Sequence, residues 1–283
     1  EEALKGQSWA KALLPLHTVN DQSVEEFLEW VAAWNTQTHL TLETTLSYYE
    51  AKRTTSAKIK VLVAAQETAP EETFSLVLHT KKRFTSGDLL AIYPDGKQER
   101  LYSIGKVGGK LQLTVKRHEH GLGSGYLYQL KQGETFQARI VPNSSFYFPK
   151  KAKKVVLVAN GTGVAPFLGM ADQNKQAEVY VYLGLRHNDA TAAEYRRFFE
   201  SQQQKGKIKN FQLIFSREAS GGYVTDLLKR DAALLTEVLT SDGVVMICGS
   251  LDMYKDVTAW LGELTPFSAD YYKANGQLLA DCY

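Results

Sequence analysis

The chain has 283 residues, which is enough for one large domain or two domains of ordinary size. Its net charge of +2 is too small to indicate nucleic acid or an anionic membrane surface as the main partner. The two cysteines, Cys248 and Cys282, form no CxxC pair, and no apolar run could span a bilayer. We therefore predict a soluble, cytoplasmic protein without a disulfide, a metal site or a membrane span.

The first stretch, residues 1–45, is predicted to be helical. Ser23 and Glu26 have the spacing of a capping box, and apolar residues then recur near the helical period as far as Trp34. No strand partners follow within this stretch, so it cannot form a domain alone. An amphipathic helix packed on the next domain is one interpretation.

Residues 46–150 are predicted to form a small antiparallel β-barrel. Short runs rich in β-branched and aromatic residues are separated by Gly-Asp, Asp-Gly, Gly-Gly and Gln-Gly-Glu turn signals. The expected strands cover 59–63, 74–78, 89–93, 111–115 and 135–140. One helical stretch, from Ser124 to Leu130, interrupts them.

Residues 151–283 are predicted to form an α/β domain of the Rossmann type. Near-continuous apolar strands alternate with helical stretches, which indicates a parallel sheet covered by helices on both faces. The expected strands cover 155–159, 178–183, 211–215 and 244–248, and the expected helices cover 166–173, 190–204, 223–239 and 252–264. Such a sheet binds ligands at the carboxyl ends of its strands. The polar segment from Pro149 to Lys154 is the predicted joint between the two domains.

The segment Gly161–Pro166 lies between a buried strand and a helix. Its glycines let backbone amides approach a pyrophosphate, and the helix N-terminus adds a partial positive charge. Pro166 suits the first helical turn, where its missing N–H is no loss. The arrangement favours a nucleotide site over a simple tight turn.

A second set of candidate binding residues lies in the barrel region. In Arg100–Ser103 the arginine can bind a phosphate, the tyrosine can stack on a planar ring and the serine can hydrogen-bond a ring nitrogen. By itself this segment equally fits an exposed arginine beside a half-buried barrel tyrosine. Gly121–Ser124, at the start of the helix in this region, adds a second N-terminus suited to an anion.

In order and spacing these motifs resemble the ferredoxin–NADP reductase superfamily over about residues 55–283. The resemblance is strongest to the FAD/NADPH reductase part of the diflavin reductases, such as cytochrome P450 reductase and the sulfite reductase flavoprotein. It implies that Arg100 meets the FAD pyrophosphate, Tyr102 stacks on the isoalloxazine and Ser103 lies near flavin N5. The other FAD contacts that it implies are Leu101, Val115, Lys116, Gly121, Gly123, Ser124 and Tyr283.

The same resemblance implies an NADPH site on the α/β domain. Gly161, Thr162 and Gly163 would form the pyrophosphate turn, with Arg186 near the nucleotide. Ser216 and Arg217 would bind the 2′-phosphate, and Tyr223 would stack on adenine. Cys248 and Gly249 would contact the nicotinamide. The lysine and glutamine that usually flank the adenine-stacking tyrosine are Gly221 and Thr225 here. One phosphate contact is therefore missing, and strict preference for NADPH over NADH stays open.

Four residues are expected to act in hydride transfer. By the resemblance, Tyr283 would cover the flavin face and move aside for nicotinamide, while Ser103, Cys248 and Asp281 would stabilise the changing charge. Holding nicotinamide against flavin is positioning catalysis. The alternative for the last residues is a docked final strand without a chemical role.

The implied function is that of an FAD-dependent NADPH oxidoreductase that passes single electrons to a flavodoxin or FMN domain, a haem protein or an iron protein. A stand-alone flavodoxin/ferredoxin–NADP reductase and a non-enzymatic flavin-binding module are the alternatives. The sequence has no room for the large helical insert that diflavin reductases carry before Arg100, so we expect a compact barrel. The segment Leu14–Trp34 resembles the end of a flavodoxin domain, and FMN would bind only on an absent upstream domain. The acceptor and the oligomeric state are not determined by the sequence.

Overall fold

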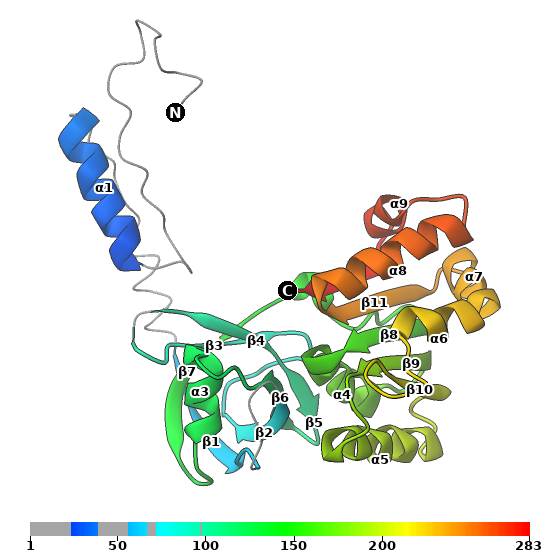
Figure 1. Cartoon of the computed structure of the whole chain (residues 1–283), viewed down its shortest axis with the longest axis horizontal. Coiled ribbons are helices and arrows are strands. Elements are labelled where there is room, and N and C mark those ends of the chain that lie inside the picture. The colour runs from blue at the N-terminus through cyan, green and yellow to red at the C-terminus, as the bar shows by residue number, and fades with distance from the viewer. Residues whose placement is uncertain (1–23, 39–55, 67–71, 97) are drawn as a thin grey trace, which may run out of the picture.

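The computed structural model describes residues 24–38, 56–66, 72–96 and 98–283. They form an antiparallel barrel sheet and a parallel sheet that lie side by side, and the helix α1 (Val24–Thr38) stands apart from both (Figure 1). The predicted fold class is therefore confirmed. The rest of the predicted helical stretch, with Ser23 of the capping box and the segment from Leu14, lies outside the described residues.

The barrel sheet has the strand order β4-β3-β7-β1-β2-β6-β5, and its paired strands are antiparallel. The strands are β1 (Ala57–Val63), β2 (Thr73–His79), β3 (Leu89–Ile92), β4 (Arg100–Ser103), β5 (Gly105–Val107), β6 (Lys110–Lys116) and β7 (Thr135–Val141). Alternate residues of β1 and β2 point into the barrel, where Ile59 and Leu76 are fully buried. The helix α3 (Leu122–Gln129) adds Leu127 to this core. The connection between β3 and β4 has no room for a helical insert, as expected.

The parallel sheet has the order β10-β9-β8-β11-β12. Its strands are β8 (Lys154–Asn160), β9 (Glu178–Leu185), β10 (Asn210–Phe215), β11 (Val244–Gly249) and β12 (Leu278–Cys282). The helices are α4 (Val164–Gln173), α5 (Ala190–Gln204), α6 (Val224–Arg230), α7 (Ala232–Thr240), α8 (Leu251–Leu264) and α9 (Ala269–Ala274), and the short 3₁₀ turns are η2 (Ser144–Phe146) and η3 (Gly161–Gly163). Helices cover both faces of the sheet (Figure 1), so each face has its own apolar core.

Two parts of the α/β region differ from the prediction. The prediction of a single helix over 223–239 is wrong, because α6 ends and α7 begins at Asp231. The Asp231 carboxylate accepts hydrogen bonds from Tyr182 Oη and Gln212 Nε2, both at 2.5 Å, and these partners hold the break against the sheet. Strand β12 was not among the four strands expected for this sheet, and it pairs with β11.

The barrel and the parallel sheet meet where α4 lies against β5. Gly169 permits this contact, because a Cβ at its position would lie 2.2 Å from Ser86 Oγ and 2.3 Å from the Lys106 backbone nitrogen. A buried hydrogen bond of 2.9 Å between the hydroxyls of Thr114 and Tyr195 also joins the two parts. The parts are therefore held together by close backbone packing as well as by side chains.

We expect Gly169→Ala to destabilise the protein by about 1–3 kcal/mol, since the added methyl group overpacks a backbone contact. Gly262→Ala is the matched control, because Gly262 is also helical and nothing lies within 4 Å of its added Cβ. That control should stabilise the protein by about 0.5–1 kcal/mol through helix propensity. Urea unfolding followed by circular dichroism measures both changes, and a neutral Gly169→Ala would show that the α4–β5 contact can open at little cost.

Candidate functional site

A cleft of about 1130 Å³ lies between the barrel and the carboxyl ends of the parallel strands. From the barrel it is lined by β4, the end of β6 and the start of α3, and from the sheet by residues at or after the ends of β8, β9, β10, β11 and β12. Most of the predicted site residues lie along its wall. They are Arg100, Leu101, Tyr102, Ser103, Val115, Lys116, Gly121, Gly123, Ser124, Gly161, Thr162, Arg186, Ser216, Arg217, Tyr223, Asp281 and Tyr283.

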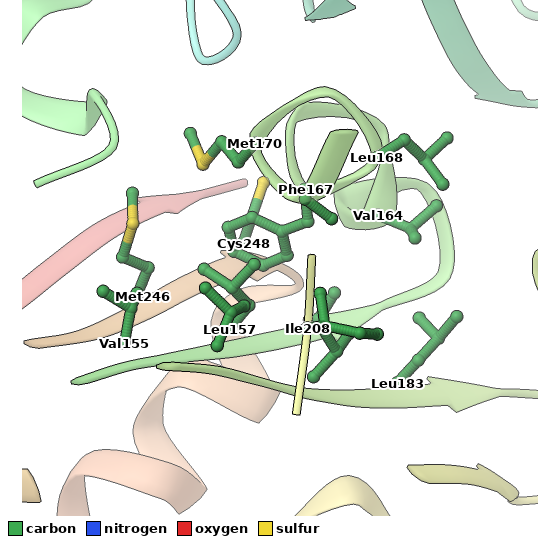
Figure 2. Close-up of a cluster of buried hydrophobic side chains, with 14 of the residues drawn as sticks. Val155, Leu157, Val164, Phe167, Leu168, Met170, Leu183, Ile208, Met246 and Cys248 are labelled. Atoms are coloured by element: carbon green, nitrogen blue, oxygen red, sulfur yellow. The ribbon is translucent and has the colours of Figure 1, made fainter. Parts of the chain in front are cut away.

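Three predicted site residues do not line the cleft: Gly163, Cys248 and Gly249. Figure 2 shows Cys248 among the apolar side chains beneath α4, and its side chain is fully buried. A Cβ at Gly163 would lie 2.0 Å from the Cys248 carbonyl oxygen, so the glycine turn rests directly on the end of β11. Burial raises the pKa of the Cys248 thiol, and the nearby Asp281 raises that pKa further.

On the barrel side, Arg100 and Tyr102 lie on β4 beside the start of α3. The Arg100 guanidinium donates to Gln98 Oε1 at 2.8 Å and to the Glu99 carbonyl oxygen at 3.2 Å. A Cβ at Gly123 would lie 2.4 Å from Tyr102 Oη, so only glycine lets α3 approach β4 this closely. Burial raises the pKa of Tyr102 to about 12, although Arg100 lowers it in part, and its ring is neutral at physiological pH. The result is a neutral aromatic ring beside an arginine and a helix N-terminus.

The start of α3 is shaped by its own side chains. The Ser124 hydroxyl accepts a hydrogen bond from the His118 backbone N–H at 3.1 Å and donates to the Gly121 carbonyl oxygen at 3.4 Å. Gly121 is the N-cap residue of α3. It has no side chain that could accept a hydrogen bond from the first N–H groups of the helix. This N-terminus lines the cleft with Lys116 beside it, which suits an anionic group.

On the nucleotide side, two residues that the sequence analysis did not identify hold the turn after β8. Asn160 Nδ2 donates to Ser250 Oγ and the Ser250 backbone N–H donates to Asn160 Oδ1, each at 2.8 Å. Gly249, between them, has φ of +139°, and a Cβ there would lie 2.1 Å from Asn160 Oδ1. Their positions could have indicated this role, because Asn160 is the last residue of β8 and Ser250 directly follows the neighbouring parallel strand β11.

The far end of the cleft is formed where β9 and β10 end. The Arg217 backbone N–H donates to the Arg186 carbonyl oxygen at 2.9 Å, which brings the two arginine positions together. Both side chains are exposed and line the cleft, with Ser216 beside them. Tyr223 is the N-cap residue of α6, and 65% of its surface is exposed. Two guanidinium groups, a hydroxyl and an open aromatic face suit a phosphorylated nucleoside.

The barrel and the sheet are joined across the cleft by a hydrogen bond from Ser103 Oγ to Asp281 Oδ2 at 2.7 Å. Asp281 lies on β12, in register with Cys248 on β11. Burial raises the pKa of Asp281, and the bond from Ser103 lowers it in part. The three groups that were predicted to act together are therefore close to one another, although the thiol is buried.

Tyr283 follows β12 and forms part of the cleft wall. Its backbone N–H donates to the Gly249 carbonyl oxygen at 3.0 Å, and its hydroxyl is hydrogen-bonded to Thr162 Oγ1 at 2.7 Å. The ring therefore bridges the end of β12 and the glycine turn, yet 59% of the residue is exposed. A group that binds at the glycine turn would compete with this ring for Thr162.

The structure combines an antiparallel barrel sheet with a parallel α/β sheet, and the cleft lies between the two. Residues 157–259 match the family model described as the oxidoreductase NAD-binding domain. The chain has the fold of a ferredoxin-NADP⁺ reductase from Plasmodium falciparum solved with 2′P-AMP, with a TM-score of 0.63 over 81% of this chain and 96% of that one, at 19% identity. The resemblance to the ferredoxin–NADP reductase superfamily is confirmed, and residues 157–259 are similar to an oxidoreductase NAD-binding domain.

The names of similar proteins describe a flavoprotein component, a reductase and an electron transfer component. The sulfite reductase [NADPH] flavoprotein alpha-component of Mannheimia succiniciproducens is 29% identical over 61% of this chain, and the NADPH–cytochrome P450 reductase of Cavia porcellus is 34% identical over 44%. The anthranilate 1,2-dioxygenase electron transfer component of Acinetobacter baylyi is 26% identical over 80%. The chain spans 33%, 21% and 65% of these three relatives, respectively.

None of the helices in the described ranges has the length and apolar character needed to cross a membrane. Within the same ranges, no group of three or more His, Cys, Asp or Glu side chains could hold a metal ion.

We expect the stability gap between the wild type and Asp281→Asn to depend on pH. Burial raises the folded-state pKa of Asp281 above its unfolded value of about 3.9, so the charged form is disfavoured in the folded protein. The wild type should therefore lose stability relative to Asp281→Asn as the pH rises from below that value through the raised pKa. Urea unfolding of both proteins between pH 4 and pH 8, at about one-unit steps, measures the gap. A gap that does not change with pH would show that this carboxyl is solvated.

Ser103→Ala is the companion variant in the same measurement. It removes the donor to Asp281, so we expect it to cost about 1.5–3 kcal/mol where the carboxylate is charged. The cost should become smaller at low pH, because a protonated carboxyl needs the donor less. An equal cost at each pH would mean that Ser103 contributes packing alone.

Proposed function

We propose that this chain is an FAD-dependent NADPH oxidoreductase that takes hydride from NADPH onto FAD and passes single electrons to an acceptor. The observation that carries the proposal is the convergence of two predicted binding motifs on one cleft, with the bond between Ser103 and Asp281 joining its two sides. In this proposal residues 46–150 form the FAD domain and residues 151–283 the NADP domain. We propose residues 1–45 as a linker or the remnant of a flavodoxin domain.

The barrel side of the cleft fits FAD. Tyr102 offers a neutral ring for stacking, Arg100 offers a guanidinium for the pyrophosphate, and the N-terminus of α3 can take a second negative charge. The close approach that Gly123 permits keeps these groups within one small region. Leu101, Val115, Lys116, Gly121 and Ser124 would complete the contacts to FAD.

The sheet side fits NADPH. Gly161 has φ of +52°, so the turn after β8 can present its backbone to a pyrophosphate. Arg186, Ser216 and Arg217 would take the 2′-phosphate, and Tyr223 would stack on adenine. Two of the named relatives carry NADPH in their names, and the solved neighbour was crystallised with 2′P-AMP, which supports a phosphorylated dinucleotide.

When bound, FAD supplies the hydride acceptor and can release electrons one at a time. The chain contributes position and charge. Tyr283 must release Thr162 before a dinucleotide can occupy the glycine turn, and this movement would uncover the cleft floor above Cys248. Ser103 donates a hydrogen bond to the Asp281 carboxyl, and in the proposed reaction this hydroxyl and this carboxyl would stabilise the changing charge.

The acceptor is proposed at the level of class: a flavodoxin or FMN domain, a haem protein or an iron protein, with FMN only on another part of a longer polypeptide. This fits a chain that spans a third of the sulfite reductase flavoprotein relative. A stand-alone flavodoxin/ferredoxin–NADP reductase is the second candidate. It is supported by the compact barrel and by the 96% coverage of the Plasmodium falciparum neighbour. Either function fits a cytoplasmic-side location.

The experiment that tests the function uses the purified chain reconstituted with FAD. We expect a yellow protein whose visible absorbance is bleached by NADPH under anaerobic conditions and which then reduces ferricyanide or cytochrome c. A protein that stays colourless after incubation with FAD would end the proposal. Bound FAD that NADPH does not bleach would instead indicate a flavin-binding module without activity.

We expect Arg217→Ala to raise the KM for NADPH about tenfold to one-hundredfold, since a hydrogen bond to a charged group contributes about 1.5–3 kcal/mol. The KM for NADH should not change, because NADH has no 2′-phosphate. Lys229→Ala, in which an exposed lysine of α6 outside the cleft is removed, is the control for general charge effects. Equal losses with both cofactors would show that Arg217 supports the fold of the loop rather than the phosphate.

A further inference from the structure

A second groove, of about 780 Å³, lies on the outer face of the barrel. It shares no lining residue with the cofactor cleft. Its lining is rich in lysine and contains no carboxylate. The lining residues are Ala57, Lys58, Lys60, His79, Thr80, Lys81, Lys82, Gly133 and Thr135.

Strand register gathers these lysines. Lys58 and Lys60 are exposed on β1 because the residues between and beside them point into the barrel. Lys60 pairs with Thr135 of β7 on one side and with His79 of β2 on the other. The chain after β2 then adds Lys81 and Lys82, both exposed. Four lysines, two on β1 and two just after the neighbouring strand β2, therefore border one groove.

Among the described residues, none of the four groove lysines makes an ion pair, whereas Lys154, Lys209, Lys255 and Lys273 each pair with a carboxylate. Like charges held this close repel one another and attract anions. The groove therefore presents four lysines without a carboxylate in its lining, on a chain whose net charge is only +2.

The groove is too far from the cofactor cleft to be part of it. Thr73 at the start of β2 lines the cleft, and His79 at the end of β2 lines the groove. At about 3.3 Å per residue, the strand separates these two points by about 20 Å. A ligand in the groove would therefore leave the cleft open.

We propose that this groove binds an acidic, extended polypeptide segment of a partner protein. The surface is concave, so a chain can lie in it, whereas a flat lipid surface would touch only its rim. The lysine stems together with Ala57 and Gly133 provide an apolar floor for the peptide backbone, and the ammonium groups provide the charge complement for Asp and Glu. The lining contains no Phe, Tyr or Trp on which a nucleic-acid base could stack. The proposal does not depend on the oxidoreductase function.

The test measures binding of fluorescein-labelled octaglutamate to the full chain by fluorescence anisotropy at low and physiological salt. The groove variant combines Lys58→Glu, Lys60→Glu, Lys81→Glu and Lys82→Glu. The matched control makes the same charge change at Lys151, Lys175, Lys205 and Lys229, which are exposed and lie outside both the groove and the cleft. A second groove variant with glutamine at the same four positions guards against misfolding, and circular dichroism checks that all the proteins are folded.

We expect saturable binding to the wild type, a loss of affinity of about tenfold or more in both groove variants, and near wild-type affinity in the control. Affinity should fall as salt is added. Equal losses in the groove and control variants would overturn the proposal, because net charge alone would then explain binding. Binding to phosphatidylserine vesicles or to single-stranded RNA that needs the groove lysines, without binding of octaglutamate, would also overturn it.

Discussion

The close approach of α4 to β5 is the constraint on which the rest of this structure depends. Helix and strand backbones touch there because Gly169 and Gly105 carry no side chain, and a Cβ at either position would lie little more than 2 Å from its neighbours. Such a contact has few alternative arrangements, since close-packed interiors do not deform continuously. It sets the barrel against the carboxyl ends of the parallel strands and so forms the cleft.

Once that contact is made, residues from distant parts of the chain can act together. Ser103 and Asp281 are 178 positions apart in the sequence, yet they share a hydrogen bond across the cleft. Tyr283 reaches from the end of β12 to Thr162 in the glycine turn. The cleft therefore has a floor built by both parts of the protein, and the Tyr283 ring is held beside the glycine turn. In the proposed function, this ring would leave Thr162 when a dinucleotide binds.

The barrel also separates two kinds of surface. One end of β2 borders the cofactor cleft, and the other end borders the lysine-lined groove. A partner that occupied the groove could stay attached while small molecules enter and leave the cleft. This separation suits a protein that exchanges electrons with a larger molecule, because attachment and chemistry would not compete for the same residues.

The sequence by itself determined the local features. Apolar periodicity and turn residues predicted most of the strands and helices, and the segments Arg100–Ser103 and Gly161–Pro166 predicted the binding motifs, because both signals are carried by neighbouring residues. Only the tertiary structure decided the break at Asp231, the burial of Cys248, the pairing of Asn160 with Ser250 and the gathering of the groove lysines. Each of these depends on which strands lie side by side, and strand order follows from packing between residues far apart in the chain.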